Sequence, residues 1–292
     1  MTAEAATARL LPDGRRLYLS HGPIDLVIEA FGDRAEVRRA YDRAWAVFPA
    51  ILPALAEELT LLRRPMAQIA TPPRGPVARR MVDACRPYAG IFLTPMAAVA
   101  GAVAEYVLEH MVADGHLSRA YVNNGGDIAI HLGEGQSFTC GLVPDLHLPA
   151  LCGQVSLRAE HPARGIATSG RACSGQGGRS FSLGIADAVT AIAATAAAAD
   201  VAATLIANAV DIPGHPSIVR VPARDLDPDS DLGARPVTVG LGALAAADVR
   251  RALRRGERRA ARLRQAGLID SAALVLRDRY AVIGPPPALA AA

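Results

Sequence analysis

Residues 165–208 read GIATSGRACSGQGGRSFSLGIADAVTAIAATAAAADVAATLIAN and join a Ser/Gly-rich loop to an Ala-rich segment. The loop offers hydroxyl groups and a flexible backbone, and the segment carries Asp187, Asp200 and Thr204. Loop N–H groups and hydroxyls suit a phosphate, and carboxylate and hydroxyl oxygens suit a hard cation. The pattern therefore indicates a site for a nucleotide with a divalent cation.

The Ala-rich segment has conflicting propensities, because Ala favours a helix whereas its β-branched residues favour a strand. In one continuous helix Asp187 and Asp200 would be separated by about 1300° of turn and would lie on different faces. We predict a strand over 188–194 and a helix over 195–210, which lets both carboxylates reach one site. Asp200 and Thr204 are four residues apart and share a helix face in either case.

On both sides of residues 165–208, the chain alternates short strands and helices. We predict strands over 10–11, 15–19, 24–31, 120–130 with a turn inside it, 136–143, 154–157, 165–168, 217–221, 236–241, 272–276 and 280–283. Further helices are predicted over 33–48, 54–63, 77–86, 95–111 and 247–266. Pro49 and Pro53 are expected to end or kink the first helix, and Trp45 is expected in the core.

Composition excludes several classes of protein. The 292 residues are 51% hydrophobic and 20% charged, which is enough for a sizeable core. The most apolar run, 186–210, is interrupted by aspartates, so we expect no membrane helix. The first 16 residues lack the pattern of a secretory signal, and a cytoplasmic location is the default.

The absence of lysine and of several known motifs excludes some kinds of catalytic and binding site. All 31 basic residues are Arg, so Schiff-base lysines and lysine-type phosphate loops are excluded. The chain has no GxGxxG, HExxH or GxSxG pattern. Its four cysteines show no CxxC spacing and are expected to be core or loop thiols.

Two glycine-containing motifs carry candidate ligand contacts. In the segment 123–127, NNGGD, consecutive glycines allow close backbone approach and Asp127 can bind a ribose hydroxyl or a cation. A hairpin or bulge is the structural alternative. Thr168, Ser169, Gly170 and Arg171 together suit a phosphate oxygen, and a solvated flexible loop is the alternative.

The remaining charged groups also have two interpretations. Asp187 and Asp200 suit a hard-cation site with Thr204, or they cap helices. The dense arginines of 247–266 suit an anionic partner or a nucleic acid, but they lack interleaved aromatic residues. A solvated basic helix face is simpler, and the net charge of +3 does not by itself indicate nucleic acid.

Three motifs occur in order along the chain: VNNGGDI at 122–128, IATSG at 166–170, and Ala199-Asp200 with Thr204. Together they resemble the ApbE superfamily of FAD:protein FMN transferases. A closer resemblance is to its UPF0280 branch, through SLGIADAVT at 182–190, ADVAAT at 199–204 with Asn208, and MAAVAGA at 96–102. The resemblance covers residues 15–284.

This resemblance implies an α+β fold related to the T-fold, with an antiparallel sheet and packed helices. We predict a single domain over 1–284, and the Pro/Ala composition of 285–292 predicts a disordered tail. It also implies FAD with Mg²⁺ as cofactors. Asp200 and Thr204 are the expected metal ligands, and the expected cofactor-binding residues are Asn124, Gly125, Gly126, Asp127, Thr168, Ser169, Gly170 and Arg171.

The FMN transferases of the superfamily carry a His-x-x-Asp-Pro-x-x-Gly segment, and here the matching region, 182–188, lacks the histidine and the proline. We therefore expect ligand binding more than FMN transfer. If the chain is an enzyme, we expect diphosphate-bond transfer or hydrolysis, with Asp187 as the catalytic candidate and Ser169 and Arg171 orienting phosphate.

The alternative hypothesis is a protein that transfers no FMN and serves tetrahydromethanopterin-linked one-carbon metabolism as a pterin-binding or partner-binding factor. The expected ligand is accordingly a small-molecule nucleotide or a pterin. A protein partner and a homodimer stay open, while a membrane and a nucleic acid are not favoured.

Overall fold

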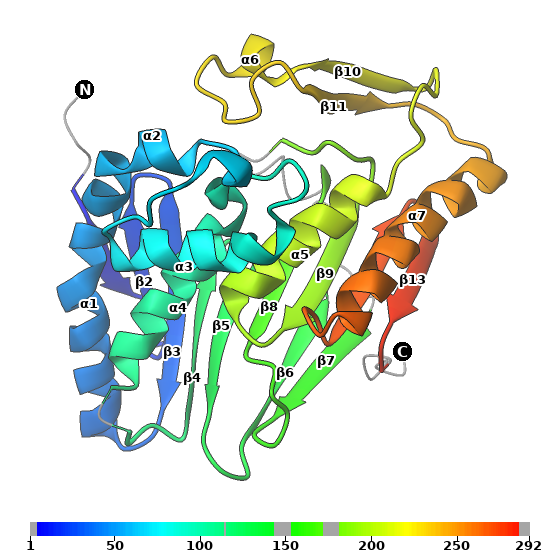
Figure 1. Cartoon of the computed structure of the whole chain (residues 1–292). Helices are drawn as coiled ribbons and strands as arrows, with labels where there is room; N and C mark the ends of the chain where they lie inside the picture. The colour runs from blue at the N-terminus through cyan, green and yellow to red at the C-terminus, as the bar shows by residue number, and fades with distance from the viewer. Residues whose placement is uncertain (1–4, 114, 143–152, 172–180, 286–292) are drawn as a thin grey trace. The chain divides into compact units, whose positions relative to one another are not determined.

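The computed structural model describes residues 5–113, 115–142, 153–171 and 181–285 (Figure 1). The chain divides into two compact units. Unit 1 comprises Met1–Phe138, Leu157–Ala167 and Ala194–Val201, and unit 2 comprises Thr139–Ser156, Thr168–Ala193 and Ala202–Ala292. The expectation of a single domain over 1–284 stays a prediction. The segment 172–180, Cys152, Cys173 and the tail from 286 lie outside the described residues.

Unit 1 is built on antiparallel strands that pair in sequence order. These are β1 (Thr7–Leu10), β2 (Leu17–His21), β3 (Ile24–Phe31), β4 (Arg119–Asn124) and β5 (Asp127–Leu132). The start of β8 (Gly165–Ser169) pairs with β5 through Ile128 and Ile166. Every second residue of β3 is buried, with Leu26 and Ile28 fully inaccessible, as expected for a sheet with one face on the core.

Helices cover one face of these strands (Figure 1). They are α1 (Arg34–Glu57), α3 (Pro76–Cys85) and α4 (Val99–Met111), with the short α2 (Leu59–Leu62) and the 3₁₀ turns η1 (Met66–Gln68), η2 (Arg86–Tyr88) and η3 (Pro95–Ala98) between them. α1 packs on β2 and β3, and α4 packs on β4 and β5. The core of unit 1 lies between these layers.

Two expectations for α1 are wrong. The helix continues through Pro49 and Pro53 to Glu57, so the second helical piece predicted from residue 54 does not exist as such. Buried Phe48, Ile51 and Leu55 flank the prolines, and their packing offsets the backbone hydrogen bonds that the prolines remove. Trp45 is 38% exposed. Its neighbour Ala44 occupies the buried stripe instead, because consecutive helical residues point about 100° apart.

Unit 2 contains an antiparallel arrangement of β9 (Ala188–Ala193), β12 (Ser271–Leu276) and β13 (Arg279–Ile283), with β12 in the middle. β10 (Ile218–Pro222) and β11 (Pro236–Leu241) pair separately, next to the short α6 (Ala223–Leu226). β6 (Ser137–Leu142) pairs with β7 (Gly153–Arg158).

α7 (Ala246–Gln265) packs on β12 and β13 with its apolar side. Gly256 permits this contact, because a Cβ there would lie 2.4 Å from Val210 Cγ2 and 2.6 Å from Leu274 Cδ2. The predicted strand-to-helix switch is confirmed: β9 is followed by α5 (Ala196–Ala209), a helix whose residues belong to both units.

The α+β class, with antiparallel strands and packed helices, is confirmed. Cys85 is buried and Cys140 is partly buried, as expected for core or loop thiols. Among the described helices, none combines the length and the apolar character that crossing a bilayer requires.

Candidate functional site

The NNGGD motif forms the hairpin turn between β4 and β5. Asn124 and Asp127 are directly paired in the register, and Gly125 and Gly126 between them have φ of +63° and +109°. The backbone N–H of Gly126 donates to Asn123 Oδ1 at 2.8 Å. Two-residue hairpin turns require positive φ, so the turn accounts for both glycines. The structural alternative for this motif is therefore realised, and a ligand contact there stays a prediction.

Asn124 connects this hairpin to the start of α4. The residue is 9% exposed, and its Nδ2 group donates to the carbonyl of Ala100 at 3.1 Å. Because Ala100 belongs to the first turn of α4, one end of β4 is joined to a helix N-terminus. That N-terminus presents backbone N–H groups that suit an anionic group.

Asp200 of α5 supplies that anionic group. The backbone N–H of Gly101 donates to its Oδ2 atom at 3.1 Å, and the N–H of Ala100 is also hydrogen-bonded to the carboxylate. Burial raises the pKa of Asp200 to about 7; the two N–H groups oppose the rise, and the negative charge of Glu105 adds to it. Within the described part of the chain, no arginine or histidine forms an ion pair with Asp200.

Glu105 makes the reciprocal contact from α4 to α5. Its Oε1 atom accepts the backbone N–H of Ala197 at 2.7 Å, and its Oε2 atom lies 3.7 Å from Arg80 Nη1. Each helix thus provides a carboxylate for the N-terminus of the other. The backbones approach so closely that a Cβ on Gly101 would lie 2.3 Å from the carbonyl oxygen of Ala196. The small-residue run at the start of α4 is explained by this approach.

These features fit a magnesium ion. A carboxylate with a raised pKa, a second carboxylate nearby and no cationic partner among the described residues would gain from an added positive charge. The described residues hold no cluster of three or more His, Cys, Asp or Glu side chains suited to a metal. Mg²⁺ needs no such cluster, because it usually binds one or two carboxylates with water and phosphate oxygens. Thr204, partly buried, follows Asp200 by one turn of α5.

Unit 2 brings together Gly170, Arg171 and Asp187. Arg171 Nη1 lies 3.7 Å from Asp187 Oδ1, and the backbone N–H of Arg171 donates to the carbonyl of Ala186 at 2.9 Å. A Cβ on Gly170 would lie 2.5 Å from the carbonyl oxygen of Asp187, so only glycine permits this approach. Burial lowers the pKa of Arg171, Asp187 opposes that shift, and the charge of Arg277 adds to it.

The two hydroxyl residues of the same motif differ in their contacts. Thr168 Oγ1 and Thr190 Oγ1 are 2.9 Å apart and hydrogen-bonded, so Thr168 links β8 to β9. Ser169 ends β8 and is partly buried. Asn208, which was noted only through the resemblance, accepts the backbone N–H of Leu183 with its Oδ1 atom at 3.0 Å.

Arg277 was missed from the sequence. Its backbone N–H donates to Asp187 Oδ2 at 2.5 Å, and its guanidinium donates to the carbonyls of Leu241 and Gly242 at 2.9 and 3.0 Å. The predicted hairpin 272–283 placed this residue in a turn, but nothing in the sequence indicated a contact with a residue 90 positions earlier.

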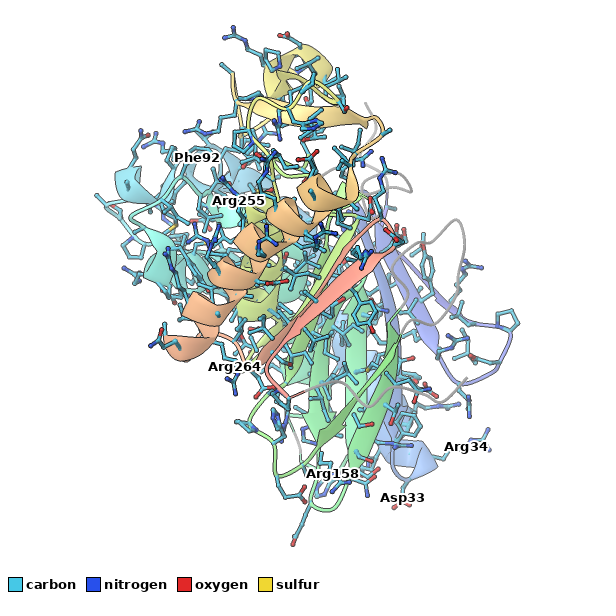
Figure 2. The ribbon with its side chains drawn as sticks, turned by 90° about the vertical axis from the view of Figure 1, so that its right-hand side faces the viewer. Asp33, Arg34, Phe92, Arg158, Arg255 and Arg264 are labelled. Carbon is cyan, nitrogen blue, oxygen red and sulfur yellow. The ribbon has the colours of Figure 1, made fainter. Side chains whose placement is uncertain are left out.

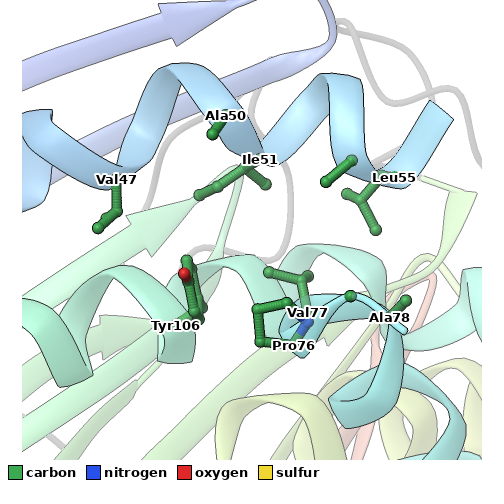
Figure 3. Close-up of a pocket in the computed structure, with 10 residues that line it drawn as sticks. Val47, Ala50, Ile51, Leu55, Pro76, Val77, Ala78 and Tyr106 are labelled. Atoms are coloured by element: carbon green, nitrogen blue, oxygen red, sulfur yellow. The ribbon is translucent and has the colours of Figure 1, made fainter. Parts of the chain in front are cut away.

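One cavity lies apart from all the predicted site residues. It has a volume of about 190 Å³ and lies in unit 1 between α1, α3 and α4 (Figure 3). Its lining is apolar except for Tyr106, and none of the predicted site residues lines it.

The arginines of α7 form another feature, with Arg255 and Arg264 both visible on that helix (Figure 2). Seven of its eight arginines are exposed.

Comparison with known proteins identifies the family. The family model described as AbpE bacteria matches residues 8–282. The chain belongs to this family. The chain is also similar to UPF0280 proteins, which confirms the resemblance to that branch.

The UPF0280 proteins of Archaeoglobus fulgidus and Methanothermobacter thermautotrophicus are each 37% identical to it, over 47% and 50% of this chain and 51% and 53% of theirs. The one from Methanopyrus kandleri is 40% identical over 45% of this chain and 48% of its own. The chain therefore spans about half the length of the curated relatives it matches. The crystal structure of Pseudomonas stutzeri flavinyl transferase ApbE in its apo form aligns with 13% identity and a TM-score of 0.43, covering 97% of this chain and 96% of that chain.

Proposed function

We propose that this AbpE-family chain binds a flavin dinucleotide-type cofactor, FAD, together with Mg²⁺. The observation that carries the proposal is Asp200, a carboxylate that burial and Glu105 make electrostatically unfavourable and that no cationic side chain of the described residues neutralises. Such a group gains most from a divalent cation. The resemblance of the motifs at 122–128, 166–170 and 199–204 to the FAD:protein FMN transferases favours flavin as the cofactor class.

Each group of residues has a separate role in this proposal. Asp200 and Thr204 hold the metal, which would neutralise the charge of the diphosphate. Arg171 binds a phosphate oxygen, with Thr168, Ser169 and Gly170 alongside it in sequence, and Asn124 to Asp127 contact the ligand through the hairpin.

Asp187 is the catalytic candidate if the protein is an enzyme. Its Oδ1 atom lies near Arg171 Nη1 and its Oδ2 atom accepts the N–H of Arg277. Both carboxylate oxygens are engaged by these neighbours, so the contacts favour an orienting role. Binding of FAD is accordingly the primary proposal, and diphosphate cleavage is the secondary one.

The test is titration of the purified protein with FAD, with and without Mg²⁺, by calorimetry. We expect saturable binding that requires Mg²⁺ and that weakens by about tenfold or more in Asp200→Asn, since loss of a metal ligand or its support has effects of that order. Asp42→Asn, an exposed carboxylate on α1, is the matched control and should bind as the unmodified protein does.

Two outcomes would contradict the proposal, and two others would decide between a catalytic and a binding role. Absence of binding at high micromolar FAD in both conditions would overturn it, as would preferential binding of tetrahydromethanopterin over FAD. Release of AMP during incubation with FAD and Mg²⁺ would show diphosphate cleavage. Tight FAD binding without AMP would assign the chain a binding role.

A further inference from the structure

We propose that Arg277 is a positioning residue of the phosphate-binding part of this site: its backbone N–H holds Asp187, and Asp187 orients the guanidinium of Arg171 for a diphosphate anion. The inference rests on the proposed function and adds a residue to it. All the contacts that carry it lie within unit 2.

The backbone of Arg277 has an unfavourable conformation. Its φ is +58°, and it is the only non-glycine residue with positive φ in the described part of the chain. The residue occupies the first position of the two-residue turn between β12 and β13, where hairpins most often place Gly or Asn. An arginine persists in this conformation only when its surroundings compensate for the strain, and such residues concentrate at functional sites.

The backbone N–H and the side chain of Arg277 both make contacts that compensate for this conformation. Its N–H donates to Asp187 Oδ2 at 2.5 Å from a backbone with φ in the left-handed region. Its guanidinium donates to the carbonyls of Leu241 and Gly242, which fixes the turn next to the end of β11. The side chain therefore secures the turn, and the backbone N–H secures Asp187.

Asp187 is in turn fixed on several sides. Its backbone N–H donates to the carbonyl of Val275 at 3.0 Å, and Gly170 packs against its carbonyl group. With Oδ2 bonded to Arg277, the other oxygen, Oδ1, remains near Arg171 Nη1 at 3.7 Å. That separation is an ion pair without a close hydrogen bond, so the Arg171 guanidinium keeps N–H groups for a ligand.

The local charge favours an anion. Arg171 and Arg277 carry two positive charges against the single negative charge of Asp187, which leaves an excess of one positive charge. Arg171 is partly buried, and burial together with the charge of Arg277 lowers its pKa. A doubly charged phosphate group would stabilise the positive charge of this guanidinium. The guanidinium can bind it with two N–H groups.

The experiment measures binding of inorganic pyrophosphate and of FAD, both with Mg²⁺, by calorimetry. Arg277→Val disfavours positive φ and should weaken pyrophosphate binding by about tenfold, the cost of losing one charge-assisted contact. Arg277→Gly keeps the backbone N–H and the positive φ but loses the guanidinium and its charge, so its affinity should fall by less than that of Arg277→Val. Arg279→Val, an exposed arginine on the same hairpin, is the matched control and should have no effect.

A double-mutant cycle separates positioning from general stabilisation. If Arg277 acts through Asp187, Arg277→Val should change affinity less than about twofold in the Asp187→Asn background. A purely structural role would leave the tenfold loss intact there. Arg277→Ala is the milder substitution if thermal unfolding shows that Arg277→Val does not fold.

Two results would overturn the inference alone: pyrophosphate affinity unchanged in Arg277→Val and Arg277→Ala, or an undiminished loss in the Asp187→Asn background. An unmodified protein that binds neither pyrophosphate nor FAD would overturn the proposed function and the inference with it. The unmodified protein thus tests the first proposal, and the variants test the second.

Discussion

Asp200 combines a structural contact with a predicted ligand role. It accepts backbone N–H groups at the start of α4, yet burial and Glu105 raise its pKa to about 7. Its ordinary pKa in an unfolded chain is about 3.9. Between about pH 4 and pH 7 the folded protein therefore binds more protons than the unfolded chain does. Asp200 makes the metal-free protein less stable as pH rises through this window.

We expect Asp200→Asn to reverse this effect. The amide still offers an oxygen to the N–H groups but carries no charge, so the metal-free variant should unfold at pH 8 at a temperature at least as high as the unmodified protein. Added Mg²⁺ should raise the midpoint of unmodified protein and leave the variant unchanged. Thermal unfolding at pH 5 and pH 8, with Asp42→Asn as control, measures both. A strongly destabilised metal-free variant at pH 8 would show that Asp200 is structural only.

Some features of the candidate site were predictable from the sequence and others were not, for a physical reason. The shared helix face of Asp200 and Thr204 was predictable because helical spacing is local, and so was the position of Asp187 before a buried strand, while their ligand and catalytic roles stay predictions. Glu105 and Arg277 were not predictable, since their contacts join residues 92 and 90 positions apart. The NNGGD motif was predictable as a hairpin, because two adjacent glycines satisfy its turn.

At the scale of elements, α4 and α5 depend on each other at their first turns. Gly101 allows the approach, Asp200 caps one helix and Glu105 caps the other. The elements themselves were largely predictable from periodicity: strand β3 and helices α3 and α7 lie within one residue of the expected bounds. α1 was not, because tertiary packing around its prolines outweighs their local preference.

We expect Gly101→Ala to disrupt this pair of helices. The added Cβ would lie 2.3, 2.5 and 2.6 Å from three backbone atoms of Ala196 and Ala197, and backbone cannot move aside as a side chain can. The cost should be about 3 kcal/mol or more in the free energy of unfolding, measured with urea. Gly90→Ala, with no atom within 4 Å of the added Cβ, is the control and should be nearly neutral. A neutral Gly101→Ala would contradict the close approach.

At the scale of the whole molecule, positive charge is concentrated on one helix. The eight arginines of α7, against Asp248 and Glu257, give it a net charge of +6, whereas the whole chain carries +3. The rest of the chain therefore has a net charge of −3. The apolar side of α7 is buried, and no aromatic residue interrupts its arginines, so the helix offers neither a membrane-binding face nor a base-stacking platform.

This distribution predicts behaviour on charged matrices. Replacing Arg250, Arg254 and Arg258 with Gln should lower the salt concentration at which the protein elutes from a cation exchanger, without changing its unfolding temperature. The same three substitutions to Lys are the control and should preserve elution. At about 150 mM salt we expect no saturable binding of duplex DNA, because weak backbone contacts are screened there. Saturable binding under these conditions would instead identify α7 as a nucleic-acid surface.

The paired carboxylates of α4 and α5 also bear on how the chain folds. Asp200 and Gly101 are 99 positions apart, and Glu105 and Ala197 are 92 apart. Neither helix can satisfy its first N–H groups until the intervening chain has closed into place. We therefore expect the two helix starts to be completed together, after the intervening chain has closed, and a metal bound at Asp200 would slow the reverse step.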